Sequence, residues 1–168
     1  MNKLEQLYNL AFDLTINIFF FDLKAIGCLG LNVEKNELGH VIFLDNSLKN
    51  NNKIHAEVLA HEIGHFYTTI GNNLNNSSTY RDELYKNKVE NKADRWAYNY
   101  LIPEKDLVVA IKKGITDMQE LAEYFDVRLE FLMKRLEYLA LLKQMIKLEN
   151  NKYLVLTNLP NLHTYEDL

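Results

Sequence analysis

Residues 55–71 constrain the fold most strongly because they place two histidines at helical spacing. The segment reads HAEVLAHEIGHFYTTIG and contains the pattern His-Glu-x-x-His. On an α-helix, His61 and His65 project from one face, where both imidazoles can bind one metal ion. Glu62 lies beside them, where its carboxylate can reach a water on that metal. Two neutral imidazoles suit Zn²⁺, and an open coordination position leaves room for the water.

A second interpretation is that the pattern arose by chance and that the histidines are hydrogen-bonded, partly buried side chains. The apolar residues favour the metal site, because they give the helix a core face that excludes both histidines. Gly64 lies in mid-helix, where glycine costs about 1 kcal/mol relative to alanine, so we expect close approach of another backbone. The apolar face consists of Ala56, Leu59, Ala60, Ile63, Tyr67 and Ile70.

Composition restricts the compartment and the partners. The chain has 168 residues, enough for one substantial domain with a small appendage, and a core of this size needs no disulfides. The single cysteine, Cys28, fits a reducing compartment and is predicted to be a small core residue. The net charge of −4 provides no electrostatic basis for general nucleic-acid binding. We find no pattern of a signal peptide or a membrane span, so we predict a cytoplasmic protein without membrane contact.

The remainder of the N-terminal half predicts further helices and a small antiparallel sheet. His40 opens the last predicted strand and is expected to be an ordinary strand-end histidine, with a place in the metal site as the alternative. Residues 72–79 are rich in Asn and Ser and predict a solvated connection, or alternatively a lid. Hydrophobic periodicity predicts helices over residues 3–13 and 81–102 and strands over 17–23, 27–31 and 40–44.

The helix predicted over 81–102 carries two carboxylates, Glu90 and Asp94, four residues apart on one face. Such a pair is most often a solvated surface near lysines. A His-Glu-x-x-His site needs a third protein ligand, and a Glu on a following helix is a common source, which makes Glu90 a candidate. Asp94 could accept a hydrogen bond from the second ring nitrogen of a ligating histidine and so fix its tautomer.

The C-terminal third predicts two short helices joined by a turn. Thr116 and Gln119 form a capping-box pattern that predicts a helix start at Thr116. Asp126 begins a turn, and residues 129–142 resume helical periodicity. This arrangement resembles a helix-turn-helix or winged-helix unit. Because the second helix carries both basic and acidic residues, we expect packing or protein binding rather than direct DNA reading. A short strand is predicted over 153–157.

Two segments together resemble the ImmA/IrrE family of metallopeptidases. The first is residues 58–65, VLAHEIGH. The second is residues 90–103, ENKADRWAYNYLIP, which matches the family pattern Glu-x-x-Ala-Asn/Asp-x-Phe-Ala…Leu-Pro with Trp96 where Phe is usual. The resemblance covers roughly residues 5–110. It implies a minimal gluzincin-like peptidase.

The resemblance assigns a role to each residue of the predicted site. Carried over by position, His61, His65 and Glu90 are the Zn²⁺ ligands and Glu62 is the general base, while Asp94 keeps its supporting place behind a histidine. We therefore predict an α+β fold in which a small antiparallel sheet packs on a minimal zincin helical core. The metallopeptidase domain is predicted over residues 1–110 and a helix-turn-helix-like segment over 111–168.

Characterised members of that family cleave a helix-turn-helix repressor, which derepresses genes of a mobile element or a stress response. The predicted function is accordingly a zinc-dependent endopeptidase acting on such a repressor, as an anti-repressor of a phage or mobile element. The alternative is a non-catalytic regulator that binds a repressor or another protein partner. The sequence does not decide which side chain stabilises the oxyanion of the reaction. The candidates are Tyr67, Tyr80, Tyr85 and His55.

Overall fold

A capping box begins the first helix in the computed structural model of the protein. Helix α1 covers Lys3–Asp13, as predicted, and Asn2 is its N-cap. The Asn2 side chain accepts a hydrogen bond from the backbone N–H of Glu5, and the Glu5 carboxylate accepts one from the backbone N–H of Asn2. These bonds satisfy two donors that a helix start leaves without partners. Leu7 and Ala11 bury one face of the helix.

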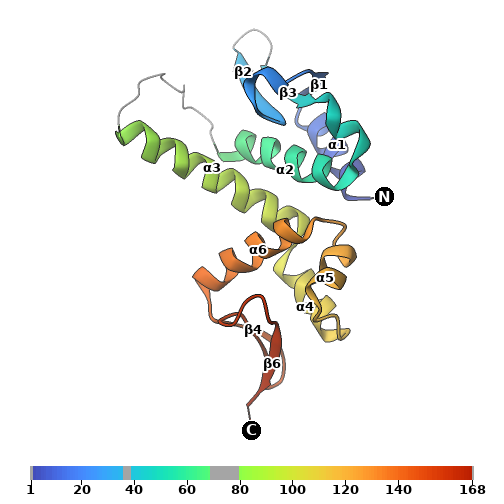
Figure 1. The fold of residues 1–168 in the computed structure, drawn as a ribbon, viewed down its shortest axis with the longest axis vertical. Coiled ribbons are helices and arrows are strands. Elements are labelled where there is room, and N and C mark those ends of the chain that lie inside the picture. The colour runs from blue at the N-terminus through green and yellow to red at the C-terminus, as the bar shows by residue number, and fades with distance from the viewer. Residues whose placement is uncertain (1, 36–38, 69–79, 168) are drawn as a thin grey trace. The chain divides into compact units, whose positions relative to one another are not determined.

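Two compact units make up the chain (Figure 1), and the α+β class predicted from the sequence is confirmed. They comprise residues 1–97 and 98–168, so the boundary falls inside helix α3, Tyr80–Leu101. The predicted functional division near residue 110 stays a prediction. The structure describes residues 2–35, 39–68 and 80–167.

Three strands form the sheet of the first unit, in the order β1-β3-β2. β2 and β3 are antiparallel, as predicted, but β1 runs parallel to β3, so the expectation of a purely antiparallel sheet is wrong. The chain between β1 and β3 contains all of β2, which gives it the length that a crossover between parallel strands requires. The strands cover Asn17–Phe21 (β1), Gly30–Lys35 (β2) and Gly39–Asp45 (β3), with single 3₁₀ turns at Lys24–Ile26 and Asn46–Asn50.

One face of this sheet forms the core of the first unit. Ile42 and Leu44 of β3 are fully buried. Helix α2, Asn52–Thr68, packs against β2 and β3, and α1 packs against α2 and β1. The opposite face carries Phe19, 53% exposed, in register with Phe43 of the central strand. The sheet thus supports α2 from one side only.

The second unit contains three helices and an antiparallel sheet of order β4-β5-β6. Helix α5 begins after Asp117, whose carboxylate accepts hydrogen bonds from the backbone N–H groups of Gln119 and Glu120. The capping residue predicted at Thr116 is wrong by one position, because Asp117 is the N-cap and the helix begins at Met118. The elements are α4 Glu104–Lys112, α5 Met118–Tyr124, α6 Leu129–Leu142, β4 Met145–Glu149, β5 Lys152–Val155 and β6 His163–Glu166.

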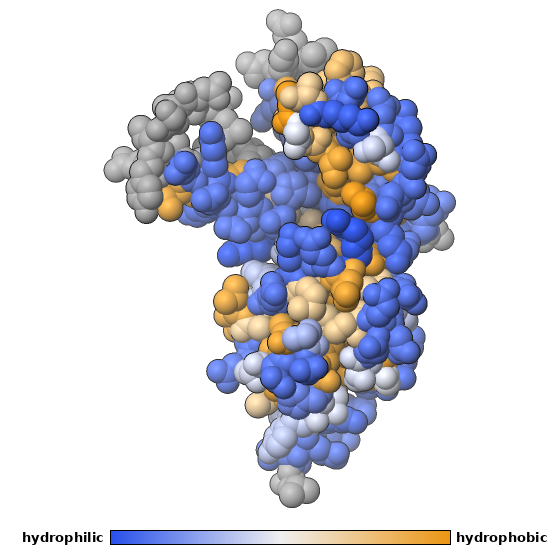
Figure 2. All heavy atoms as spheres, in the orientation of Figure 1, coloured by the Kyte–Doolittle hydropathy of each residue, from blue (hydrophilic) through white to orange (hydrophobic). Residues whose placement is uncertain are grey.

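A guanidinium lies within the core of this second unit. Arg135 of α6 is 1% exposed, and its Nε donates to the backbone oxygen of Ile102 at 3.1 Å. Tyr98 of α3 packs edge-on against Phe131, which lies on α6 like Arg135. The face drawn in Figure 2 is mostly hydrophilic, with apolar patches in each unit. Among the described residues, no helix combines the length and the apolar character of a membrane span.

Candidate metal centre

Helix α2 separates its apolar core residues from His61 and His65, as the spacing predicts. Ala56, Leu59, Ala60 and Ile63 are buried. Tyr67 is 41% exposed, so its assignment to the core face is wrong; its ring instead stacks on Trp96 of α3. The residue expected to complete the stripe, Ile70, lies outside the described residues.

Gly64 is a point of close backbone contact between α2 and α3. A Cβ on Gly64 would lie 2.6 Å from the backbone oxygen and 3.0 Å from the Cα of Ala93, so only glycine permits this approach. The close backbone contact expected from a mid-helix glycine is therefore confirmed. Ala93 lies between Glu90 and Asp94 on α3, and the contact consequently sets the distance of both carboxylates from the histidines of α2.

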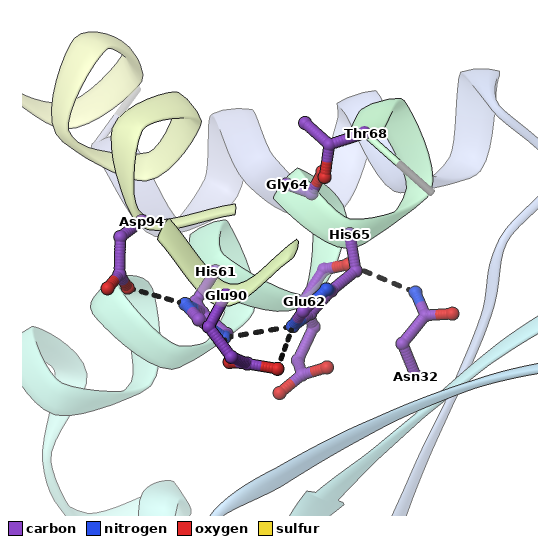
Figure 3. A network of polar contacts seen from close by, with 8 residues as sticks. All are labelled: Asn32, His61, Glu62, Gly64, His65, Thr68, Glu90 and Asp94. Atoms are coloured by element: carbon purple, nitrogen blue, oxygen red, sulfur yellow. Dashed lines mark hydrogen bonds and ion pairs between the residues drawn. The ribbon is translucent and has the colours of Figure 1, made fainter. Parts of the chain in front are cut away.

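The structure brings His61, His65 and Glu90 together as a group that could hold a metal ion (Figure 3). Their donor atoms all lie within 4.8 Å of one another. The Nε2 atoms of the two histidines are 3.0 Å apart, and the Glu90 oxygens lie 3.2 Å from Nε2 of His61 and 3.6 Å from Nε2 of His65. Donors about 2.0–2.1 Å from a tetrahedral zinc ion are separated by about 3.3 Å. The three measured separations bracket that value, so the donor set fits such an ion.

Asp94 lies behind His61 rather than in the triad. Its Oδ1 is 2.8 Å from Nδ1 of His61, the ring nitrogen that faces away from Glu90. A carboxylate at Nδ1 favours the tautomer that carries its proton there, which leaves Nε2 with a free lone pair for a metal. Figure 3 shows Asp94 and Glu90 approaching the same imidazole from α3.

The carboxylates make the triad strongly attractive to positive charge. Burial lowers the pKa of His61, but hydrogen bonds to Asp94 and Glu90 outweigh it and raise that pKa to about 10. Hydrogen bonds to His61 and then His65 hold the pKa of Glu90 well below its usual range. The Glu90 side chain is 57% exposed, so the group opens to solvent on one side. A divalent cation would meet one carboxylate, that of Glu90, and two imidazoles there.

Glu62 has a different environment from the two other carboxylates. It is 6% exposed, and burial raises its pKa, although the charges of His61 and His65 act in the opposite direction. Its main-chain oxygen accepts a hydrogen bond from Nδ2 of Asn32 on β2, at 3.0 Å. A carboxylate whose pKa is raised above its usual value accepts a proton more readily than an exposed glutamate does.

The remaining histidines have other contacts. His40 packs edge-on against Phe66 and lies 3.6 Å from the carboxylate of Glu34, outside the triad. Nε2 of His55 is 2.9 Å from the hydroxyl of Tyr8, and the His55 ring is buried.

The tyrosines considered as oxyanion donors have no contact to the triad among the described interactions. Tyr85 is 38% exposed on α3, and the side chain of Tyr80 lies outside the described atoms.

Sequence reasoning missed two residues of the site, both on β2. Gly30 lies against the side chain of Glu62, and Asn32 bonds to its backbone. A glycine inside a strand does signal close approach of another group, so Gly30 carried a usable signal. Asn32 carried none, because its partner depends on how α2 packs on the sheet.

Two histidines on one helix, a carboxylate on the next helix and a buried glutamate beside them define the class of a metallopeptidase-like site. The family described as Peptidase M78, IrrE N-terminal-like domain, matches residues 11–137. The chain therefore belongs to this family, the ImmA/IrrE group, which confirms the resemblance seen in the sequence. No curated protein and no solved structure matches the chain significantly.

Proposed function

We propose that the chain is a zinc-dependent endopeptidase in which His61, His65 and Glu90 hold the metal. The observation that carries this proposal is the spacing of their donor atoms, at 3.0, 3.2 and 3.6 Å, together with a donor set of two imidazoles and one carboxylate. Bound zinc supplies a Lewis acid and lowers the pKa of water that it binds. Asp94 keeps the lone pair of His61 directed at the metal.

Glu62 is proposed as the general base. Its raised pKa lets the carboxylate take a proton from the attacking water and return it to the leaving amine of the cleaved peptide. Burial keeps bulk water away from this carboxylate, so the proton stays within the site during the reaction. Glu62 is not proposed as a ligand, which separates metal binding from catalysis in the variants described below.

The substrate is proposed to bind as an extended segment along β2. This strand is an edge of its sheet, and Gly30 on it lies against Glu62. An edge strand offers main-chain hydrogen bonds to an added strand, which presents peptide bonds in a regular, extended row. Such a mode selects flexible segments or linkers over folded domains.

The substrate is proposed to be a helix-turn-helix repressor, as the family suggests, and the chain would then act as an anti-repressor of a phage or mobile element. A linker between two folded parts of such a repressor would suit binding in extended form. Such a substrate would place the activity in the cytoplasm, in line with the sequence prediction.

The proposal is tested by incubating the zinc-loaded full chain with small helix-turn-helix repressors encoded near its gene and identifying fragments by mass spectrometry. We expect one main cleavage site in a repressor, and Glu62→Gln should slow cleavage by about 10²–10⁴-fold while its zinc content stays that of wild type. Loss of zinc from Glu62→Gln would contradict the assignment of this residue as base. Binding of a repressor without cleavage by the zinc-loaded wild type would favour the non-catalytic regulator instead.

A further inference from the structure

The edge strand β2 holds the side chain of Glu62 through two residues that face α2. Gly30 and Asn32 are two apart, so they lie on the same face of the strand. A Cβ on Gly30 would lie 2.5 Å from Oε1 and 2.8 Å from Cγ of Glu62, and 2.8 Å from Cγ1 of Val58. Real Cβ atoms essentially never approach so closely. The carboxylate therefore occupies the space that any other residue at position 30 would fill.

Asn32 completes the contact from the same strand. Its side-chain amide donates to the main-chain oxygen of Glu62 at 3.0 Å, as Figure 3 shows, and its backbone hydrogen-bonds to the Glu62 carboxylate. One bond ties α2 to β2 at this residue, and the other orients the carboxylate. The strand thus contacts Glu62 in three ways. Gly30 lies against the carboxylate, the Asn32 backbone bonds to the carboxylate, and the Asn32 side chain bonds to the main-chain oxygen.

Placement matters for a base more than for most side chains. A misplacement of about 1 Å at a reacting group lowers rate by about 10²-fold, even when binding of the substrate is intact. The ligands of the metal triad come from α2 and α3, and their contacts with one another and with Asp94 lie within these two helices. The atom nearest to a Cβ on Gly30 is the far end of the flexible Glu62 side chain, which shifts more readily than a helix backbone. A change at position 30 can therefore move the base while the ligands stay in place.

We infer that Gly30 is a positioning residue for catalysis: the absence of a side chain at this place in β2 is what lets the Glu62 carboxylate lie beside the metal triad. This inference rests on the proposed function for its kinetic consequence. Its structural consequence is independent of that function. Gly30→Ala should displace the carboxylate and leave His61, His65 and Glu90 where they are.

The test compares crystal structures, zinc content and kinetics of the full-length wild type and Gly30→Ala. We expect one zinc per chain in both proteins and a displacement of the Glu62 carboxylate by about 1 Å or more in the variant, which removes the overlap at 2.5 Å. For the repressor that the cleavage assay under the proposed function identifies, kcat should fall about 10²-fold with little change in KM. Phe19→Ala is the control, because Phe19 lies on β1 of the same sheet, is 53% exposed on the face opposite α2, and does not belong to the proposed substrate strand.

Combining the variant with Glu62→Gln separates a positional effect from general damage. If Gly30 acts through Glu62, Gly30→Ala should slow the residual activity of Glu62→Gln by less than about twofold. An equal loss in both backgrounds would overturn the inference, as would an unmoved carboxylate in the crystal structure. If the wild type cleaves no repressor, the proposed function fails, but the crystallographic comparison still decides the position of Glu62.

A second pair of variants provides the control for misfolding of Gly30→Ala. Part of the overlap at position 30 is with Val58, so Val58→Ala combined with Gly30→Ala relieves that contact and keeps the one with Glu62. The double variant, compared with Val58→Ala alone, should again show a displaced carboxylate and unchanged zinc content. A carboxylate in its wild-type position in this folded double variant would refute the inference.

Discussion

Gly64→Ala tests whether the crossing of α2 and α3 sets the metal site. Ordinary van der Waals contact begins near 3.4 Å, and a Cβ on residue 64 would lie 2.6 Å from the backbone oxygen of Ala93. The helices must separate by about 0.8 Å locally to remove this overlap. The neighbouring atoms belong to the α3 backbone, which cannot rotate away as a side chain would. Glu90 and Asp94 flank Ala93, so they move with it.

The expected magnitude follows from two opposing terms. Replacing a mid-helix glycine by alanine stabilises a helix by up to about 1 kcal/mol, while overpacking of a close contact typically destabilises by about 1–3 kcal/mol. We therefore expect a net loss of about 1–2 kcal/mol in the free energy of unfolding. A displacement of about 0.8 Å also exceeds the tolerance of roughly 0.5 Å for a preorganised site, so zinc affinity should fall by at least about tenfold.

Urea unfolding of the metal-free protein and competition with a chromophoric zinc chelator measure the two effects. Ala60→Gly, a change of the same size in the buried face of α2, controls for helix propensity and is expected to weaken stability without a comparable specific loss of zinc. If Gly64→Ala proves more stable than wild type by about 1 kcal/mol and binds zinc equally well, helix propensity alone is acting and the crossing does not set the site.

Three further predictions concern single residues. Asp94→Asn should weaken zinc binding by about 10–100-fold in the same competition assay, because a neutral amide holds the ring of His61 less firmly than the carboxylate does. Burial lowers the pKa of His55 below its usual value of 6.5. The contribution of neutral His55 to stability is therefore full above pH 6.5 and is lost as the pH falls through the folded-state pKa. Urea unfolding at pH 7.5 and 5.5 should accordingly show a smaller pH dependence of stability in His55→Gln than in wild type. Arg135→Met should leave the free energy of unfolding within about 1 kcal/mol, because burying a guanidinium is itself unfavourable, whereas Arg135→Ala should lower it by about 3 kcal/mol through the cavity it leaves.

Local sequence patterns predicted the helices that carry the candidate site. Helical spacing places His61 and His65 on one face and Glu90 and Asp94 on one face of the next helix, whatever the rest of the fold does. Apolar spacing likewise predicted α1 at Lys3–Asp13 and placed the end of α3 to within one residue. These features depend on neighbours three or four residues away, which the sequence displays directly.

Features that depend on distant partners were not predicted. The parallel pairing of β1 with β3 follows from the crossover through β2, and no local pattern states which strand will be central. Strand β6 was missed because it is exposed throughout, so hydrophobic periodicity gives little signal. Strand β4 was also missed, although its five residues alternate between exposed and buried. Helix α4 after Pro103 was also missed.

The contacts of Gly30 and Asn32 with Glu62 depend on how α2 packs against the sheet, and this is a tertiary property. The contact of Trp96 with Tyr67 is a second tertiary feature of this kind. The sequence showed only that Trp96 replaces a usual Phe, whereas the structure shows its ring stacked on Tyr67, with centroids 5.2 Å apart, where it joins α3 to α2. Aromatic pairs of this kind contribute about 0.5–1.5 kcal/mol beyond area burial.

The metal content of the purified full chain tests the central claim most directly. Elemental mass spectrometry should find about one zinc per chain in wild type and a sharp reduction in both His61→Ala and Glu90→Ala. Loss from His61→Ala alone would retain the site but remove Glu90 as a ligand, with Asp94 as the next candidate. A wild-type protein that carries no metal even after zinc is supplied would contradict the account.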